Sequence, residues 1–340
     1  MENGLFDLDF RLRELDKGGD PLLKLNETVD WEIFRPDLET IRAKERKSNA
    51  GRPPFDVVLM FKIMVLQSLY NLADDAVEYQ IRDRLSFMRL LGLSLGDRVP
   101  DAKTIWLFRE QLTEAGLVEA LFGRFDAYLH AKGFAARKGQ IIDASITAVP
   151  RQRNTREENE TIKQGQTPEA WEARPAKLRQ KDTDARWTKK NGVNHYGYKN
   201  HIGVDVEHKL IRTWAVTDAA RHDSQLFEQL LDEDNTCRAV WADSAYRSAE
   251  ILKKLQKYRL REHIQRKGHR GRRLSEHEKR GNRTRARVRA RVEHVFGIQA
   301  MRAGGLIVRT IGIIRARCKI GLRNLAYNVD RFAMLASAKG

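Results

Sequence analysis

The stretch Arg283–Gly297, RTRARVRARVEHVFG, places one acidic residue inside a strongly basic segment. Arginine occupies every odd position from 283 to 291, and apolar residues recur at helical spacing at Val288, Val292, Val295 and Phe296. The segment therefore predicts a helix with an apolar stripe and a basic face. Glu293 lies beside the stripe and, on a helix, shares a face with Arg289. By itself, this pattern is more typical of an ordinary Glu–Arg pair on a protein surface.

Two further acids lie in or directly after short apolar runs that predict strands. In GQIIDASITAVP, residues 139–150, β-branched residues surround Asp143. A second run, residues 239–242, leads to Asp243, and Ser248 then opens a helical pattern. Because an unpaired aspartate is costly to bury, each of these acids either caps a neighbouring turn or is neutralised by a cation.

Taken together, Asp143, Asp243 and Glu293 supply three carboxylates, the ligands that hard divalent cations such as Mg²⁺ prefer. A pair of such ions about 3.5–4 Å apart can activate a water or hydroxyl and stabilise the leaving oxygen of a phosphodiester. The sequence therefore predicts a Mg²⁺ site with these three residues as ligands and catalytic groups, in which Mn²⁺ substitutes.

Four motifs follow one another along the chain: IIDAS, HYGYKNHIGVD, VWADSAYRS and RVEHVFG. In this order they resemble the DDE transposases of insertion sequences, most closely the family named after insertion sequence five, which is related to the insertion sequence four type. The resemblance runs from GRPPFDVVLMFKIMVLQSLY to the last helix. It implies an α+β or α/β fold: a ribonuclease H-like domain with a mixed five-stranded sheet and flanking helices, preceded by an all-helical domain. It also implies that Asp143, Asp243 and Glu293 form the acidic triad.

The family's signature around the glutamate is tyrosine, two residues, arginine, three residues, glutamate, six residues and lysine. Arg289 and Glu293 fit this signature, whereas Ala286 and Ala300 stand at the tyrosine and lysine positions. The resemblance implies that Arg289 contacts DNA. Arg302 is the cation that can replace the missing lysine.

Other predicted DNA contacts are basic or aromatic residues near these motifs: Arg285, Trp187, Lys189, Lys190, Lys199 and His201. Lys199 and His201 match the family's Gly-Tyr-Lys-x-His stretch, although a solvated lysine is nearly as compatible with the pattern. Trp187, beside two lysines, is predicted to stack on an unpaired base at a DNA end. The arginine run that includes Arg285 is predicted to contact phosphates without choosing a base, although charge runs are usually solvated faces.

The composition bounds the class of protein. A formal net charge of +17 and a pI near 9.9 indicate a polyanionic partner, and a 41% hydrophobic share favours a globular fold over a basic tail. Cys237 and Cys318 lack metal-ligand spacing and are interpreted as reduced thiols. The start, MENGLFDLDF, is unlike a signal peptide, and Val57–Leu66 is too short to span a bilayer. We expect a soluble protein that binds no membrane, and the resemblance implies the bacterial cytoplasm and nucleoid.

The chain is predicted to consist of an N-terminal extension (1–50), a helical DNA-binding or dimerisation domain (51–135) and the catalytic domain (136–340). Residues 151–192 are polar and are predicted to be an insertion or mobile loop, with Trp171 pinning a small subdomain. Strands are expected at 139–149, 195–206, 210–216, 239–242 and 261–265. A helix is expected at 222–231, with Asp223 as its N-cap.

The predicted function is that of a transposase. It would cut at the terminal inverted repeats of its insertion sequence and join the 3′ ends to target DNA by two-metal chemistry. Because two ends must be joined in one event, a homodimer on paired ends is expected. Two alternatives stay open: a ribonuclease H-like nuclease without strand transfer, and a catalytically silent DNA-binding regulator.

Overall fold

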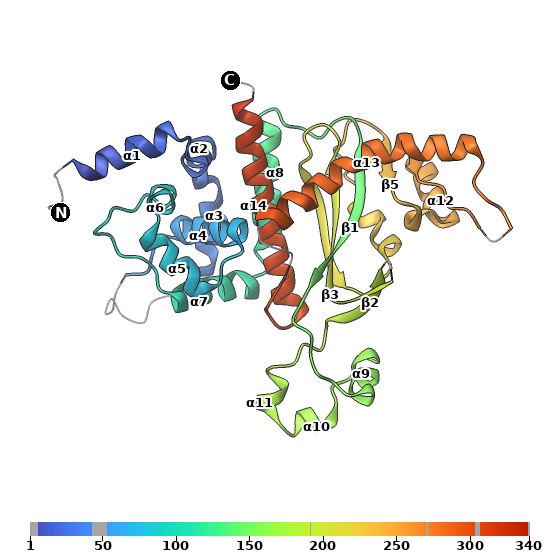
Figure 1. Ribbon diagram of the computed structural model, residues 1–340, viewed down its shortest axis with the longest axis horizontal. Helices are drawn as coiled ribbons and strands as arrows, with labels where there is room; N and C mark the ends of the chain where they lie inside the picture. The colour runs from blue at the N-terminus through green and yellow to red at the C-terminus, as the bar shows by residue number, and fades with distance from the viewer. Residues whose placement is uncertain (1–5, 43–52, 191, 270, 303–306, 339–340) are drawn as a thin grey trace. The chain divides into compact units, whose positions relative to one another are not determined.

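The computed structural model describes residues 6–42, 53–190, 192–269, 271–302 and 307–338. They divide into two units, one of residues 1–127 with 322–340 and one of residues 128–321. Two helices, α8 (Val118–Ala131) and α14 (Ile313–Ser337), contribute residues to both units. Figure 1 labels the elements along the chain.

The first unit is helical. Besides parts of α8 and α14 it contains the helices α1 (Asp7–Lys17), α2 (Pro21–Thr28), α3 (Arg35–Glu39), α4 (Val57–Tyr70), α5 (Asp74–Asp83), α6 (Leu85–Leu91) and α7 (Ala102–Glu114), and the 3₁₀ turns η1 (Trp31–Phe34) and η2 (Thr40–Arg42). Helix α4 is its core, because almost every side chain from Val57 to Leu69 is buried. Asp101 is the N-cap of α7, since its carboxylate accepts the N–H of Thr104 at 2.7 Å.

Residues 6–42, within the predicted N-terminal extension, also contribute to this helical core. Trp31 and Phe34, at 5% and 0% exposure, pack on Phe61 of α4 with ring centroids 6.4 and 4.6 Å away. The sequence predicts these positions only as part of an N-terminal extension. Within the described residues, no single helix is long and apolar enough to cross a membrane, although α4 and α5, bent by 103°, pass that test as a pair.

The second unit is built on a six-stranded mixed sheet. Its strands are β1 (Gln140–Ala148), β2 (Arg186–Lys190), β3 (Val193–Asp205), β4 (Ile211–Asp218), β5 (Ala239–Ala242) and β6 (Arg261–Ile264). The long strand β3 pairs antiparallel with β1, β2 and β4, whereas β5 and β6 run parallel to β1 in the order β1-β5-β6. An antiparallel meander continued by two parallel strands is the ribonuclease H-like arrangement, as the resemblance implied.

Apolar side chains cover both faces of this sheet. On one face Ile142, Val240 and Ala242 pack with Tyr246 and with α12 (Ala249–Lys257). On the other, Tyr196 and Tyr198 of β3 pack with the first turns of α14. Helix α13 (Glu276–Arg302) packs against β1 and β5.

Gly203 lets β3 approach β4 closely. A Cβ atom at this position would lie 2.3 Å from Thr213 Oγ1 and 2.5 Å from the Leu230 carbonyl oxygen. Both contacts are far shorter than van der Waals distance, so only glycine fits here without a shift of the backbone.

The polar segment 151–192 is folded rather than a plain loop. It forms the short helices α9 (Arg156–Lys163), α10 (Glu169–Glu172) and α11 (Pro175–Leu178), which lie together beyond the ends of β1 and β2 (Figure 1). Trp171 is fully buried at their centre, and its Nε1 donates to Glu158 at 2.5 Å. The Tyr198 hydroxyl donates to the buried Asp182 carboxylate, 2.8 and 2.7 Å from its two oxygens, which ties the insertion to the sheet.

Two local predictions were wrong. Strand β2 lies in the segment where no strand was expected, because pairing with the start of β3 sets its conformation. Residues 223–230 form the 3₁₀ turns η3 (Asp223–Leu226) and η4 (Glu228–Leu230) instead of a helix. The cap of η3 is His222, whose ring Nδ1 accepts the N–H of Ser224 at 3.3 Å, while the Asp223 carboxylate turns to Lys199.

Candidate active site

Strand pairing brings Asp143 and Asp243 together. In the parallel ladder between β1 and β5, Ile141 is level with Trp241 and Ile142 with Ala242. The next residues in register are Asp143, within β1, and Asp243, which directly follows the carboxyl end of β5. Neighbouring strands are about 4.8 Å apart and level side chains share a face, so these carboxylates are close neighbours.

Asp143 is held in a largely buried position. Its Oδ1 accepts its neighbour Ala144's backbone N–H at 2.8 Å, and its Oδ2 accepts Nη2 of Arg289 at 2.9 Å. Burial raises the pKa of the Asp143 carboxyl above its ordinary value. The positive charge of Arg289 and the N–H bond partly oppose this rise, and the charge of Asp243 adds to it.

Asp243 is half-buried and begins the 3₁₀ turn η5 (Ser244–Tyr246). Its Oδ1 accepts the N–H of Ala245 at 2.8 Å. This is the turn-capping role that is the simplest explanation of an aspartate at a strand end. The second carboxylate oxygen is not used by that cap, so capping and a ligand role are compatible on one side chain.

Helix α13 brings a cation to this pair. The Arg289 side chain, 14% exposed, reaches Asp143 with one nitrogen and the Gln265 side-chain oxygen with the other, at 2.9 Å each. Glu293 follows one helical turn later and is exposed. Across the described residues, no three His, Cys, Asp or Glu side chains lie close enough to hold a metal ion. The structure thus joins Asp143, Asp243 and Arg289, and leaves Glu293 apart on the same helix.

The donor set fits a hard divalent cation. Two neighbouring carboxylates repel each other, and the raised pKa of Asp143 expresses both that repulsion and its burial. Carboxylate oxygens are the ligands that Mg²⁺ and Mn²⁺ prefer, and a cation between them would remove the repulsion. The Arg289 guanidinium partly fills this electrostatic role in the structure.

Two protein-family models match the chain. The model described as "Transposase DDE domain" matches residues 135–329, more than half of the chain. The chain belongs to this transposase family. A second model, described as "Transposase domain (DUF772)", matches residues 10–111. A solved structure titled as the piggyBac transposase synaptic complex with hairpin DNA is 13% identical, with a TM-score of 0.47 over 94% of this chain and 76% of that one.

Two of the transposase's predicted DNA contacts turn inward. His201 is fully buried, and its Nε2 lies 2.8 Å from Thr217 Oγ1, so it offers no surface to DNA, contrary to the prediction. Lys199 Nζ is bound 2.8 Å from Asp223 Oδ1 and donates to the Arg221 carbonyl at 2.7 Å. The ammonium of Lys199 is therefore occupied within the protein rather than free for a phosphate.

Arg289 also differs from its prediction, because its guanidinium binds Asp143 and Gln265 instead of lying open to DNA. Arg285, one turn earlier on α13, is half-buried. The side chain of Arg302 lies outside the described residues. Some arginines of this run therefore point toward the sheet. The sequence alone does not show which ones do so.

Strand β2 carries the remaining predicted contacts on the transposase surface. Trp187 is 44% exposed and packs against Tyr196 with ring centroids 5.1 Å apart. The Arg151 guanidinium lies 5.6 Å from the Trp187 ring centroid. Lys189 and Lys190 are exposed on the same strand.

Sequence reasoning missed Tyr246, which lies fully buried beside the acids. Burial raises the pKa of its hydroxyl well above the ordinary value, and the charges of Asp223, Asp143 and Asp243 raise it further. The phenol is therefore a neutral group in the core cluster of Ile142, Val240 and Ala242, near enough to the acids for their charges to act on it. Its place in the motif VWADSAYRS is the signal that could have pointed to it.

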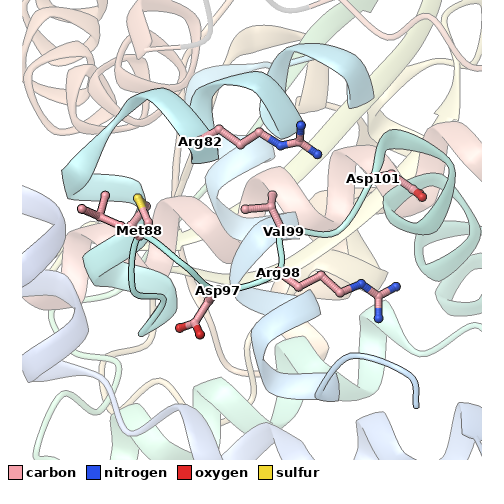
Figure 2. A pocket seen from close by; sticks show the side chains of 7 residues that line it. Arg82, Met88, Asp97, Arg98, Val99 and Asp101 are labelled. Atoms are coloured by element: carbon pink, nitrogen blue, oxygen red, sulfur yellow. The ribbon is translucent and has the colours of Figure 1, made fainter. Parts of the chain in front are cut away.

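The helical unit contains a pocket of about 670 Å³ (Figure 2). It is lined by Arg82, Met88, Leu95, Asp97, Arg98, Val99 and Asp101. Its charges are balanced, since two arginines face two aspartates. Arg82 is already paired with Glu78 at 2.7 Å, and the Arg98 guanidinium stacks 4.1 Å from the Phe55 ring centroid. This balance favours no particular class of ligand.

Proposed function

We propose that this transposase cuts DNA at the terminal inverted repeats of its own insertion sequence and joins the freed 3′ ends to target DNA. The observation that carries the proposal is the parallel pairing of β1 with β5, which puts Asp143 of β1 next to Asp243, the residue after β5. The motif order resembles that of the insertion sequence five family, whose elements have such ends, and this resemblance supports the proposal. DNA as the partner is in keeping with the net charge of +17.

Asp143 and Asp243 would hold a divalent cation, Mg²⁺ with Mn²⁺ as a substitute, and Glu293 would complete the ligands. Bound there, such ions supply activation of the attacking oxygen and stabilisation of the leaving oxygen. Glu293 is exposed on α13, so its approach requires a shift of that helix or of its side chain.

The chain's own residues prepare the site. Arg289 fixes the Asp143 carboxylate and Gln265 in place, which orients one of the three proposed ligands. The N–H of Ala245 does the same for Asp243. Buried Tyr246 is close enough to feel the charges of the pair, and the dry core around it would strengthen charge interactions at the acids.

The flanking segments have proposed roles of their own. Residues 51–135 are proposed to bind DNA ends or to dimerise, residues 136–340 to carry the chemistry, and residues 1–50 and 151–192 to be accessory to them. Exposed Trp187 with Lys189 and Lys190 is proposed to hold a DNA end by stacking and charge. A homodimer on paired ends follows from the need to join two ends in one event.

The test is a strand-transfer assay with Mg²⁺, labelled DNA carrying the ends of the element, and a supercoiled target. Wild type should give joined products and Asp243→Asn none, although asparagine can keep the cap of η5. Asp234→Asn, the same change in an exposed loop, is the matched control and should stay active.

Each other outcome identifies a rival. Cleavage without joined products would indicate a nuclease, and the strand-transfer proposal would be wrong. DNA binding by wild type without cutting, in Mn²⁺ as well as Mg²⁺, would indicate a regulator. Equal activity of Asp243→Asn and the control would remove Asp243 from the site.

A further inference from the structure

A second charged site lies at the carboxyl end of β6, in the segment that leads into α13. It is a pocket of about 230 Å³, called here the β6–α13 pocket. Its lining residues are Arg247, Arg266, Lys267, Gly268, His269, Arg272, Arg273, Leu274 and Glu278.

Positive charge exceeds negative charge in this pocket. Five of the lining residues are arginine or lysine, and one is an acid. The Glu278 carboxylate forms ion pairs with Arg266 and Arg272, at 3.2 and 3.4 Å. Glu262, next to the pocket, forms an ion pair with Arg247 at 3.1 Å. Lys267 and Arg273 are exposed, and neither has an ion-pair partner within the described part of the chain. Two cations are therefore left for an external anion.

The pocket adjoins the acidic pair through one residue. Gln265 donates its N–H to the Ala242 carbonyl at 3.1 Å, directly before Asp243. Its side-chain oxygen accepts from Arg289, which holds Asp143. The next residue along the chain, Arg266, already lines the pocket. A molecule lying at Asp143 and Asp243 thus has the pocket as its immediate neighbour on the β6 side of the sheet.

The size and lining of the pocket select the anion. Sites for drug-sized ligands span roughly 300–1,000 Å³ and are mostly apolar, whereas this pocket is smaller and Leu274 is the apolar side chain in its lining. Arginine and lysine bind phosphate oxygens through charge-assisted hydrogen bonds. Most contacts that fix a protein on DNA without reading its sequence run from Arg and Lys to phosphate oxygens, so a backbone phosphate is the anion that this lining favours.

We propose that the β6–α13 pocket binds a phosphodiester group of the DNA backbone, next to the strand positioned at Asp143 and Asp243. Lys267 and Arg273 make the contact, and the three paired arginines supply the surrounding positive field. The contact adds affinity that does not depend on base sequence. This inference rests on the proposed function, since it needs DNA at the neighbouring acids.

The experiment measures DNA binding in EDTA, so that no cutting takes place. A fluorescent duplex with the element end and one of unrelated sequence are titrated between 50 and 200 mM NaCl, which gives the slope of log Kobs against log[NaCl]. Each phosphate contact contributes about 0.9 to this slope. Lys267→Gln/Arg273→Gln should make the slope less steep by about 0.9 and weaken both duplexes by a similar factor.

The matched control is Lys253→Gln/Lys257→Gln, which removes two exposed cations from α12 in the same unit. It should leave the slope at the wild-type value. Thermal unfolding of both double variants checks that each is folded, and the single variants Lys267→Gln and Arg273→Gln serve if the double variant is not. Equal slopes for the pocket and control variants would overturn the proposal.

Two further outcomes are distinct. If ³¹P NMR shows that inorganic phosphate binds wild type but not the pocket variant, while their DNA slopes agree, the pocket takes free phosphate and the DNA proposal is wrong. If the pocket variant changes the slope but wild type neither cuts nor joins DNA, the pocket proposal stands and the proposed function fails.

Discussion

Lowering the pH from 7.5 to 5.0 is expected to destabilise the folded sheet through His201. This residue is fully buried beside β4, where Thr217 is its hydrogen-bond partner. Burial lowers the pKa of His201 from 6.5 to about 4, an effect that Asp223 opposes and that Lys199 and Arg221 reinforce. The imidazole is therefore neutral in the folded protein at pH 5, whereas in the unfolded chain it is protonated.

The sign and size follow from proton linkage. Below pH 6.5 the imidazole is protonated in the unfolded state but stays neutral in the folded state. The free energy of unfolding therefore decreases as the pH is lowered, until the pH reaches the folded-state pKa of about 4. One pKa unit corresponds to about 1.36 kcal/mol, so the whole shift is worth about 3.4 kcal/mol. About 2 kcal/mol of this is lost by pH 5.0.

The assay is equilibrium urea unfolding at both pH values for wild type, His201→Gln and His277→Gln. Carboxylates titrate alike in all three proteins, so the difference between wild type and His201→Gln isolates the buried imidazole. His277 is exposed on α13, and its variant should follow wild type. If wild type and His201→Gln lose the same free energy between pH 7.5 and 5.0, His201 is not a buried neutral group and the reasoning is refuted.

Three further predictions concern the fold and the acidic pair. Trp171→Ala should lower the free energy of unfolding by about 3–5 kcal/mol and open the insertion to limited proteolysis, whereas exposed Trp187→Ala should change stability by less than about 0.5 kcal/mol. Gly203→Ala should lower the thermal midpoint by several degrees in calorimetry, because its Cβ meets neighbouring atoms at 2.3 and 2.5 Å; an unchanged midpoint would show that β3 relaxes freely. A double-mutant cycle with Arg289→Ala and Asp143→Asn should give a coupling free energy of about 1.5–3 kcal/mol in EDTA, and a value near zero would mean that this ion pair is absent in solution.

Most strands of the sheet could be predicted because their residues carry local signals. β-branched and apolar runs mark β1 and β5, and the alternation through 195–216 marks the hairpin of β3 and β4. Asp143 and Asp243 stand out because an acid in or directly after such a run is unusual. The two aspartates become neighbours only because the two runs pair as parallel strands. The resemblance implied this pairing, whereas the local sequence pattern did not.

The failed predictions share a physical cause, since each depends on a partner distant in the chain. Strand β2, RWTKK, has little strand character and is set by pairing with β3. Asp223 has the spacing of an N-cap, yet the stronger attraction of Lys199 turns it away. Arg289 stands in a run of similar arginines, and nothing local distinguishes the one that meets Asp143.

The pairing of β1 with β5 also fixes when the acidic pair can exist during synthesis. Ribosomes release the chain from its N-terminus, and early segments fold first. A nascent chain that has released β1 and the insertion still lacks Asp243, and α13 with Arg289 follows later still. A message truncated before residue 239 therefore yields a protein with most of its helical unit and no acidic pair. Only a chain synthesised past residue 243 contains both aspartates, so products that end earlier lack the acidic pair that the proposed chemistry requires.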